Sequence, residues 1–159
     1  LGMEPPHDDM NRLTAKKIQN SQAVALHVRW FDAPNSRGKY NCSSEYYRRA
    51  LAVMEEWTEQ PRYFLFSDKP EAAARKLALP ADRLTVVSHN RGDENAWADL
   101  WLMRQCRHFI TANSTFSWWG AWLGDGSDKI VITPHIVQDQ IEATNWGFQG
   151  LIPEWWIKL

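Results

Sequence analysis

The chain has few cysteines and no long apolar run, and these absences exclude several classes of protein. Cys42 and Cys106 are its two cysteines, and their spacing is not that of zinc ligands, so we expect reduced thiols and no disulfide framework. No apolar run reaches the roughly 18 residues that a transmembrane helix needs, and no signal peptide is recognisable. These absences favour a cytoplasmic location without a transmembrane segment.

The chain also lacks an excess of charge and several ligand-binding motifs. Its net charge of −1 argues against a nucleic-acid partner, because such proteins present a broad basic surface. The glycine-rich dinucleotide motif, the P-loop and the nucleophile elbow of hydrolases are all missing. The nearest approach to a metal-binding pair is Asp8 with Asp9, in a segment that we place outside the core. We therefore predict no metal site.

Tryptophan, in contrast, is abundant, with ten residues in a chain of 159. A hydrophobic content of 44% and this length predict one soluble domain with a substantial core. We expect most of the tryptophans to pack in the core or between helices, as large aromatic residues usually do. Tryptophans on the surface would instead favour a platform for sugars.

Short apolar segments alternate with helical patterns along the chain. Because such alternation is typical of parallel sheets covered on both faces, we predict a Rossmann-like α/β fold, an open parallel sheet of about five strands with helices on both faces. Residues 1–22 are expected to be an N-terminal tail or linker helix, and residues 23–159 to form the ligand-binding domain. The tail beyond the fifth strand is expected to be irregular. The predicted strands cover residues 23–28, 63–66, 84–87, 107–112 and 129–133.

Polar residues follow the predicted strands, where parallel sheets bind their ligands. Arg29 is the most informative of them, because a guanidinium at the mouth of a buried strand needs a carboxylate or a phosphate. Contact with a phosphate is the favoured interpretation, and a pair with Asp32 is the alternative. The other polar residues at strand ends are His27, Ser67, Asp68, Ser88, His89, Asn90, Asn113, Ser114, Thr115, Thr133 and His135.

The run from Asn113 to Trp122 (NSTFSWWGAW) joins a predicted strand to a predicted aromatic helix. Small polar residues at such a junction place hydroxyl and N–H groups at the start of the helix, which favours bound anions. The run therefore predicts a pocket for a phosphorylated ligand.

Six segments share the spacing and residue types of one known family. They are residues 27–33 (HVRWFDA), 66–68 (FSD), 99–106 (DLWLMRQC), 113–123 (NSTFSWWGAWL), 129–134 (KIVITP) and 152–156 (IPEWW). Together they resemble the α-1,2-fucosyltransferases of glycosyltransferase family 11, over about residues 23–159. The match at 113–123 is complete. In the first segment Trp30, Phe31 and Ala33 stand where the family has Arg, Gly and Tyr.

The resemblance implies an inverting, metal-independent transfer of L-fucose from GDP-fucose to the 2-hydroxyl of a galactoside, with no cofactor besides the donor substrate. It implies a GT-B-like enzyme of two domains, in which this chain is the C-terminal, donor-binding half and an N-terminal half is missing. The partners are then a nucleotide sugar and a galactose-containing glycan acceptor. For the full-length bacterial protein it implies peripheral association with the inner face of a membrane.

Together with the strand ends, the resemblance predicts the site residues. Arg29 is expected to contact the donor pyrophosphate, and Asp32 is a candidate general base, a role that the N-terminal half could also supply. Because Trp30 stands where the family has an arginine, one cation is missing near the pyrophosphate, and loss of activity is an open alternative. Stacking of Trp30 on a sugar or base is another. The predicted donor-binding residues are His27, Arg29, Ser67, Asp68, His89, Asn90, Asp99, Asn113, Ser114, Thr115, Phe116 and Ser117.

Two alternatives to a fucosyltransferase stay open. One is a non-catalytic domain that binds carbohydrate, or binds a nucleotide sugar without turning it over. The other is a transferase that uses a different nucleotide sugar. Titration with glycans and with GDP distinguishes the first alternative from a fucosyltransferase. Competition between donors distinguishes the second.

Overall fold

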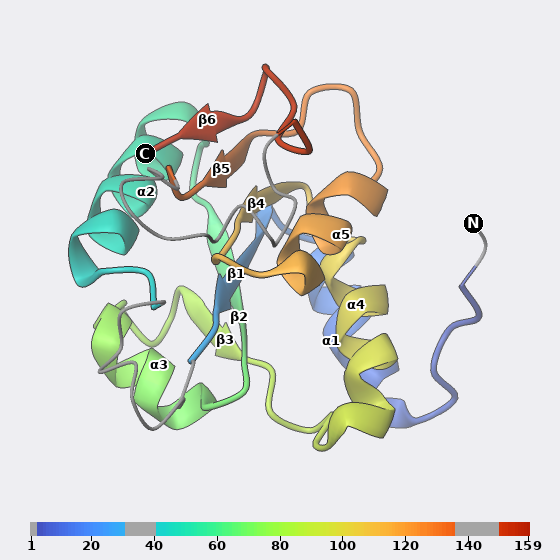
Figure 1. Cartoon of the computed structure of the whole chain (residues 1–159). Helices are drawn as coiled ribbons and strands as arrows, with labels where there is room; N and C mark the ends of the chain where they lie inside the picture. The colour runs from blue at the N-terminus through green and yellow to red at the C-terminus, as the bar shows by residue number, and fades with distance from the viewer. Residues whose placement is uncertain (1–2, 31–40, 136–149) are drawn as a thin grey trace.

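The computed structural model describes residues 3–30, 41–135 and 150–159, which form one sheet between two layers of helices (Figure 1). All paired strands run parallel, in the order β3-β2-β1-β4-β5-β6. This confirms the Rossmann-like α/β class. The strands are β1 (Ala23–Val28), β2 (Arg62–Ser67), β3 (Leu84–Val86), β4 (His108–Ile110), β5 (Val131–Thr133) and β6 (Ile157–Lys158).

The sixth strand corrects the expectation of about five strands and an irregular tail. β6 pairs with β5 through Ile157 opposite Ile132, and the Leu159 N–H donates to the Thr133 carbonyl at 3.1 Å. A strand of two residues has no periodicity to recognise in a sequence. Its existence depends on the neighbouring strand, which supplies the hydrogen bonds.

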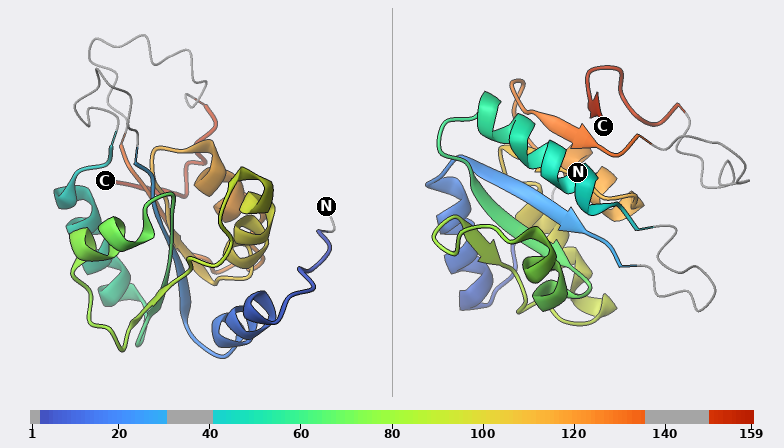
Figure 2. Two further views of the ribbon diagram at one scale, coloured as in Figure 1. Left: turned by 90° about the horizontal axis from the view of Figure 1, so that it is seen from below. Right: turned by 90° about the vertical axis from the view of Figure 1, so that its left-hand side faces the viewer.

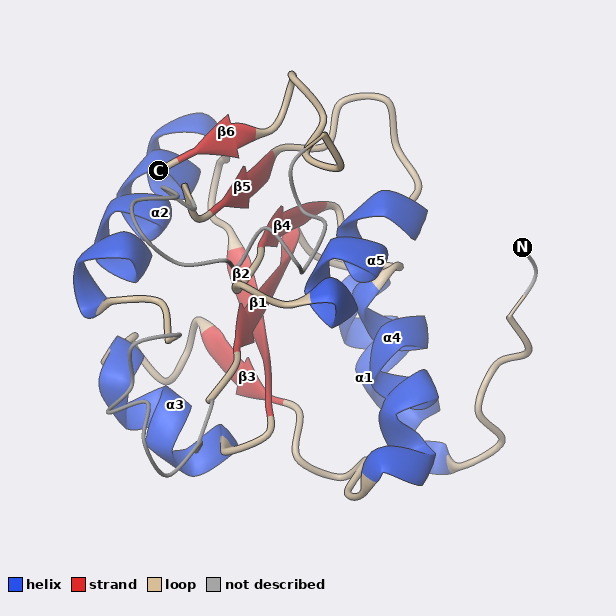
Figure 3. Cartoon of the chain, viewed as in Figure 1, coloured by secondary structure: helices blue, strands red, loops and turns tan. Residues whose placement is uncertain are grey.

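Helices cover both faces of the sheet, as Figures 2 and 3 show. On one face, α2 and α3 pack on Val24, Leu26 and Val28 of β1. On the other face, α1, α4 and α5 pack on Ala23 and Ala25. This division follows from the alternation of side chains along β1. The helices are α1 (Asp9–Gln19), α2 (Ser44–Trp57), α3 (Pro70–Leu77), the 3-10 turn η1 (Asp93–Asn95), α4 (Ala96–Met103) and α5 (Thr115–Leu123).

The N-terminal segment packs on the core through α1, which corrects its assignment to a tail outside the core, but Asp8 and Asp9 themselves are exposed as expected. Asp8 caps α1 by accepting the Asn11 N–H at 2.9 Å, and the hydrogen bonds from Asn11 lower its carboxyl pKa. Ala15 and Ile18 of α1 are buried against the sheet. The division of the chain at residue 22 stays a prediction.

The tryptophans are less buried than expected. Trp156 is buried, but Trp57, Trp97, Trp119, Trp122 and Trp155 are 46–59% exposed. In α5 the reason is the close approach to α4, where a Cβ on Gly120 would lie 3.0 Å from Met103 Cε. Small residues occupy the contact side, so Trp119 and Trp122 are left outside. Exposed aromatic rings are the feature that a sugar platform needs.

Candidate functional site at the carboxyl edge of the sheet

The strand order reverses between β1 and β4, which are neighbours in the sheet. The chain builds β2 and β3 on one side of β1 and then β4, β5 and β6 on the other side. In such sheets ligands bind outside the carboxyl ends of the strands at this switch point. His27 and Arg29 lie at the end of β1, and α5 begins beyond β4. The fold therefore brings two separately predicted segments to one place.

His27 is buried at this switch point with an unused polar atom. Its side chain is 4% exposed, and its Nδ1 has no hydrogen-bond partner among the described residues. The ring lies 5.5 Å, centroid to centroid, from that of Phe116 in the first turn of α5. Burial, and then the nearby charge of Arg29, lower the His27 pKa to about 3. His27 is therefore a neutral imidazole at pH 7, and its Nδ1 is a buried polar atom without a hydrogen-bond partner in the described part of the chain.

The hydroxyls at the start of α5 shape the turn that leads into the helix. Ser114 caps α5 by accepting the Phe116 N–H at 3.3 Å. Ser117 is fully buried, and its Oγ accepts the Ala112 N–H at 3.1 Å. Thr115 is exposed at the first helical position. First-turn N–H groups have no acceptor within their own helix. Ser114 satisfies that of Phe116, and the Phe116 ring contact places this first turn beside His27.

Arg29 pairs with Asp68 at the end of β2. Arg29 Nη1 lies 3.6 Å from Asp68 Oδ2, and the two side chains are 45% and 28% exposed. Asp68 Oδ1 also accepts the backbone N–H of Trp30 at 2.9 Å. Asp68 thus orders the exit of β1. The favoured phosphate contact of Arg29 and its alternative pair with Asp32 both stay predictions. Asp32 lies outside the described residues, as do Phe31 and Ala33. Ser67 Oγ accepts the Lys69 N–H at 3.1 Å.

A second polar cluster joins α1 to the segment after β3. Asn11 Oδ1 accepts from Asn90 at 2.9 Å and lies 3.0 Å from His89 Nε2. Asn90 also donates to Asp99 Oδ1 at 2.9 Å. Burial raises the pKa of Asp99 to about 6 and lowers that of His89. The predicted residues His89, Asn90 and Asp99 therefore do meet, around Asn11.

Asn11 and Cys42 are the two members of these contacts that the sequence analysis did not single out. Asn11 is 2% exposed, and the N-cap pattern with Asp8 is the local signal that could have drawn attention to it. Cys42 Sγ accepts the Asn113 N–H at 3.3 Å. No local pattern links residues that are 71 positions apart. Burial raises the Cys42 pKa, so this thiol is held in its neutral form.

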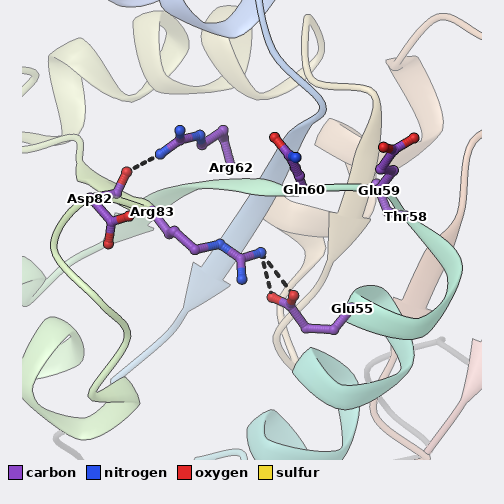
Figure 4. Close-up of a pocket in the computed structure, with 7 residues that line it drawn as sticks. All are labelled: Glu55, Thr58, Glu59, Gln60, Arg62, Asp82 and Arg83. Atoms are coloured by element: carbon purple, nitrogen blue, oxygen red, sulfur yellow. Dashed lines mark hydrogen bonds and ion pairs between the residues drawn. The ribbon is translucent and has the colours of Figure 1, made fainter.

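A polar hollow of about 390 Å³ lies at the opposite, amino edge of the sheet (Figure 4). Both of its arginines donate hydrogen bonds within it. Arg83 Nη2 donates to both Glu55 oxygens at 2.7 and 2.8 Å, and Arg62 donates to the Asp82 carbonyl. These contacts stabilise the amino ends of β2 and β3 and occupy both arginines.

Two features are absent from the described ranges 3–30, 41–135 and 150–159. Those residues contain no group of three or more His, Cys, Asp or Glu that could hold a metal ion. Within the same ranges no helix combines the length and the apolar character needed to cross a membrane.

The sequence profile of the family "Glycosyl transferase family 11" matches residues 7–157, nearly the whole chain. The chain belongs to this family. The match begins before α1, in agreement with the packing of that helix into the core. It also includes the carboxyl-edge residues described above.

Two curated relatives from Escherichia coli are similar to this family member. The chain is 32% identical to "O-antigen biosynthesis glycosyltransferase WbnK" over 125 residues, which is 75% of the chain and 41% of the relative. It is 27% identical to "Alpha-1,2-colitosyltransferase" over 146 residues, which is 89% of the chain and 49% of the relative. The chain thus spans less than half the length of the curated relatives it matches.

A solved structure, "E. coli heptosyltransferase WaaC with ADP", also resembles the chain. The TM-score is 0.45 at 18% identity, with 87% of this chain and 42% of that chain covered.

Proposed function

We propose that this chain is the donor-binding part of a glycosyltransferase that moves L-fucose from GDP-fucose to the 2-hydroxyl of a galactoside. Membership of family 11 supports transfer of a sugar. The relative named for an α-1,2-colitosyl transfer supports the linkage. The acceptor site would come from a second half of the protein, in keeping with the greater length of the relatives.

The observation that carries the proposal is the unsatisfied polarity at the switch point. A GDP leaving group gains negative charge as the sugar bond breaks, and fixed cations and N–H dipoles stabilise that charge. Arg29 would supply a guanidinium, α5 its first-turn N–H groups, and His27 a neutral hydrogen-bonding nitrogen. Inversion requires one displacement, in which a base takes the proton of the acceptor hydroxyl. Asp32 remains the candidate base.

Titration with GDP tests the donor site directly. We expect chemical-shift changes at Arg29, Phe116 and Ser117 in an NMR titration of the chain, and we expect Arg29→Ala to abolish saturable binding. Arg83→Ala is the matched control, because it removes a guanidinium from the opposite edge of the sheet. A titration without shifts around Arg29 and α5 would contradict a working donor site.

A colitosyl donor is the second candidate, because the relative of that name matches 89% of the chain. Competition between fucosyl and colitosyl nucleotides in a transfer assay with the full-length protein separates the two. If the enzyme turns over the colitosyl donor faster, the transferred sugar is colitose rather than fucose, and the proposed donor site is unchanged.

Non-catalytic binding of carbohydrate is favoured by one observation, the exposure of Trp119 and Trp122 at 47% and 50%. This alternative predicts galactoside binding without nucleotide, with perturbed tryptophan fluorescence. The E. coli relatives support a bacterial origin. The cytoplasmic location and the peripheral association with a membrane stay predictions.

A further inference from the structure

Lys76, in the last turn of α3, is a partly buried cation close to the end of β1. Its Nζ donates to the Cys42 carbonyl at 2.9 Å and lies 5.2 Å from the centroid of the Trp30 ring and 5.5 Å from that of Tyr47. Burial lowers the Lys76 pKa. No ion pair joins Lys76 to a carboxylate in the part of the chain that the structure describes.

The three contacts of Lys76 tie it to the candidate donor site from the face opposite α5. The Trp30 N–H is held by Asp68, which also pairs with Arg29. The Tyr47 hydroxyl donates to the His27 carbonyl at 3.1 Å. Cys42, whose carbonyl Lys76 contacts, accepts the Asn113 N–H through its Sγ. Lys76 therefore touches groups that hold the exits of both β1 and β4.

The local charge balance shows why this cation matters. Arg29 and Asp68 carry opposite charges and largely cancel, whereas Lys76 rests on two aromatic faces and one neutral carbonyl. An ammonium has three donors, and a cation withdrawn from water without an anion is costly. Aromatic faces attract it but do not neutralise it. Among the described residues 3–30, 41–135 and 150–159, Lys76 of α3 thus contributes positive charge to this part of the site without a carboxylate partner.

We propose that Lys76 is a positioning and specificity residue that favours a diphosphate over a monophosphate at this site. The inference rests on the proposed function. Lys76 orients Trp30 and the Cys42–Asn113 contact, and its charge attracts the terminal phosphate of the nucleotide. The side chain at position 30 lies against the Lys76 ammonium, so an arginine there would restore a cation to nearly the same place.

The test compares the affinities of GDP, GMP and guanosine by calorimetry at two salt concentrations. For Lys76→Met we expect GDP binding to weaken about tenfold and to lose part of its salt dependence, since one phosphate-directed cation is removed. Binding of GMP should change less, and binding of guanosine should not change. Arg75→Met, an exposed cation in the same turn, is the matched control and should leave all three affinities unaltered. Trp30→Arg combined with Lys76→Met should recover GDP affinity.

Each other result is decisive. Equal weakening of GDP, GMP and guanosine would mean that Lys76 only supports the fold, and would overturn the inference. Unchanged GDP affinity in Lys76→Met would overturn it too. If Lys76→Met fails to fold, Lys76→Gln and Lys76→Arg replace it, with a GDP-to-GMP ratio restored only by arginine as the expected result. Failure of the unaltered chain to bind GDP would refute the proposed function and the inference with it.

Discussion

The two edges of the sheet are both polar, but they differ in how their charges are satisfied. At the amino edge, Arg83 makes two short hydrogen bonds to Glu55. At the carboxyl edge, Arg29 lies 3.6 Å from Asp68, and His27 Nδ1 has no partner among the described residues. The amino edge is hollow, but both of its arginines already donate hydrogen bonds within it. Buried polar groups without a partner therefore indicate a ligand site better than a hollow in the surface does.

The largest expected difference between the edges is in catalysis. Arg29→Gln should lower kcat/KM for the donor about 100-fold in the full-length protein, as removal of one preorganised charge-stabilising group does. Arg83→Gln should change it less than about threefold, because Arg83 lies at the opposite edge of the sheet, away from the charge that develops at the donor. An assay of sugar transfer that monitors the release of GDP measures kcat/KM for both variants. Equal losses in the two variants would remove the distinction between the edges.

Substitutions at the amino edge should instead change the stability of the fold. Glu55→Ala leaves Arg83 and the hydroxyl of the buried Tyr63 without their shared acceptor, which should lower the free energy of unfolding by about 2 kcal/mol. Urea denaturation measures the loss, and the affinity for GDP should not change. The control Glu45→Ala breaks an exposed pair with Arg48 and should have little effect.

His27 should make the carboxyl edge sensitive to acid. Its pKa of about 3 is below the ordinary 6.5, so the unfolded chain binds a proton more readily, and stability is lost as the pH falls from about 6.5 toward 3. At pH 5.5 the loss should be about 1 kcal/mol relative to neutral pH. His27→Leu should remove this part of the pH dependence in urea denaturation. An acid transition identical in the variant would show that His27 is not the buried neutral group.

Asp99 should give a smaller effect with the opposite sign. Its folded pKa, about 6, is above the ordinary 3.8, so its charge opposes folding, and stability falls as the pH rises from about 4 to 6. Asp99→Asn should therefore raise the free energy of unfolding by roughly 1 kcal/mol at pH 7 and leave it unchanged at pH 3. Thermal unfolding at both pH values measures this. A variant that is less stable at pH 7 would contradict the assignment.

Much of the fold and part of the site were predictable, and the failures share a cause. The parallel sheet, the helix at α1 and the convergence of His27 with the run from Asn113 follow from local patterns and strand ends. The partner of Arg29 does not, because Asp68 reaches it across neighbouring strands. The exposure of Trp119 also escaped prediction, since it depends on which side of α5 can approach α4.

The sequence by itself determined the α/β class, the family and the identity of the chemical groups that follow each strand. Residue type and spacing carry that information directly, because periodicity and strand ends are local properties. Only the tertiary structure decided which groups keep a partner. It paired Arg29 with Asp68, gave His27 Nδ1 no partner among the residues that the structure describes, and set Lys76 against Trp30. These outcomes depend on contacts between distant segments and on burial, which no local pattern encodes.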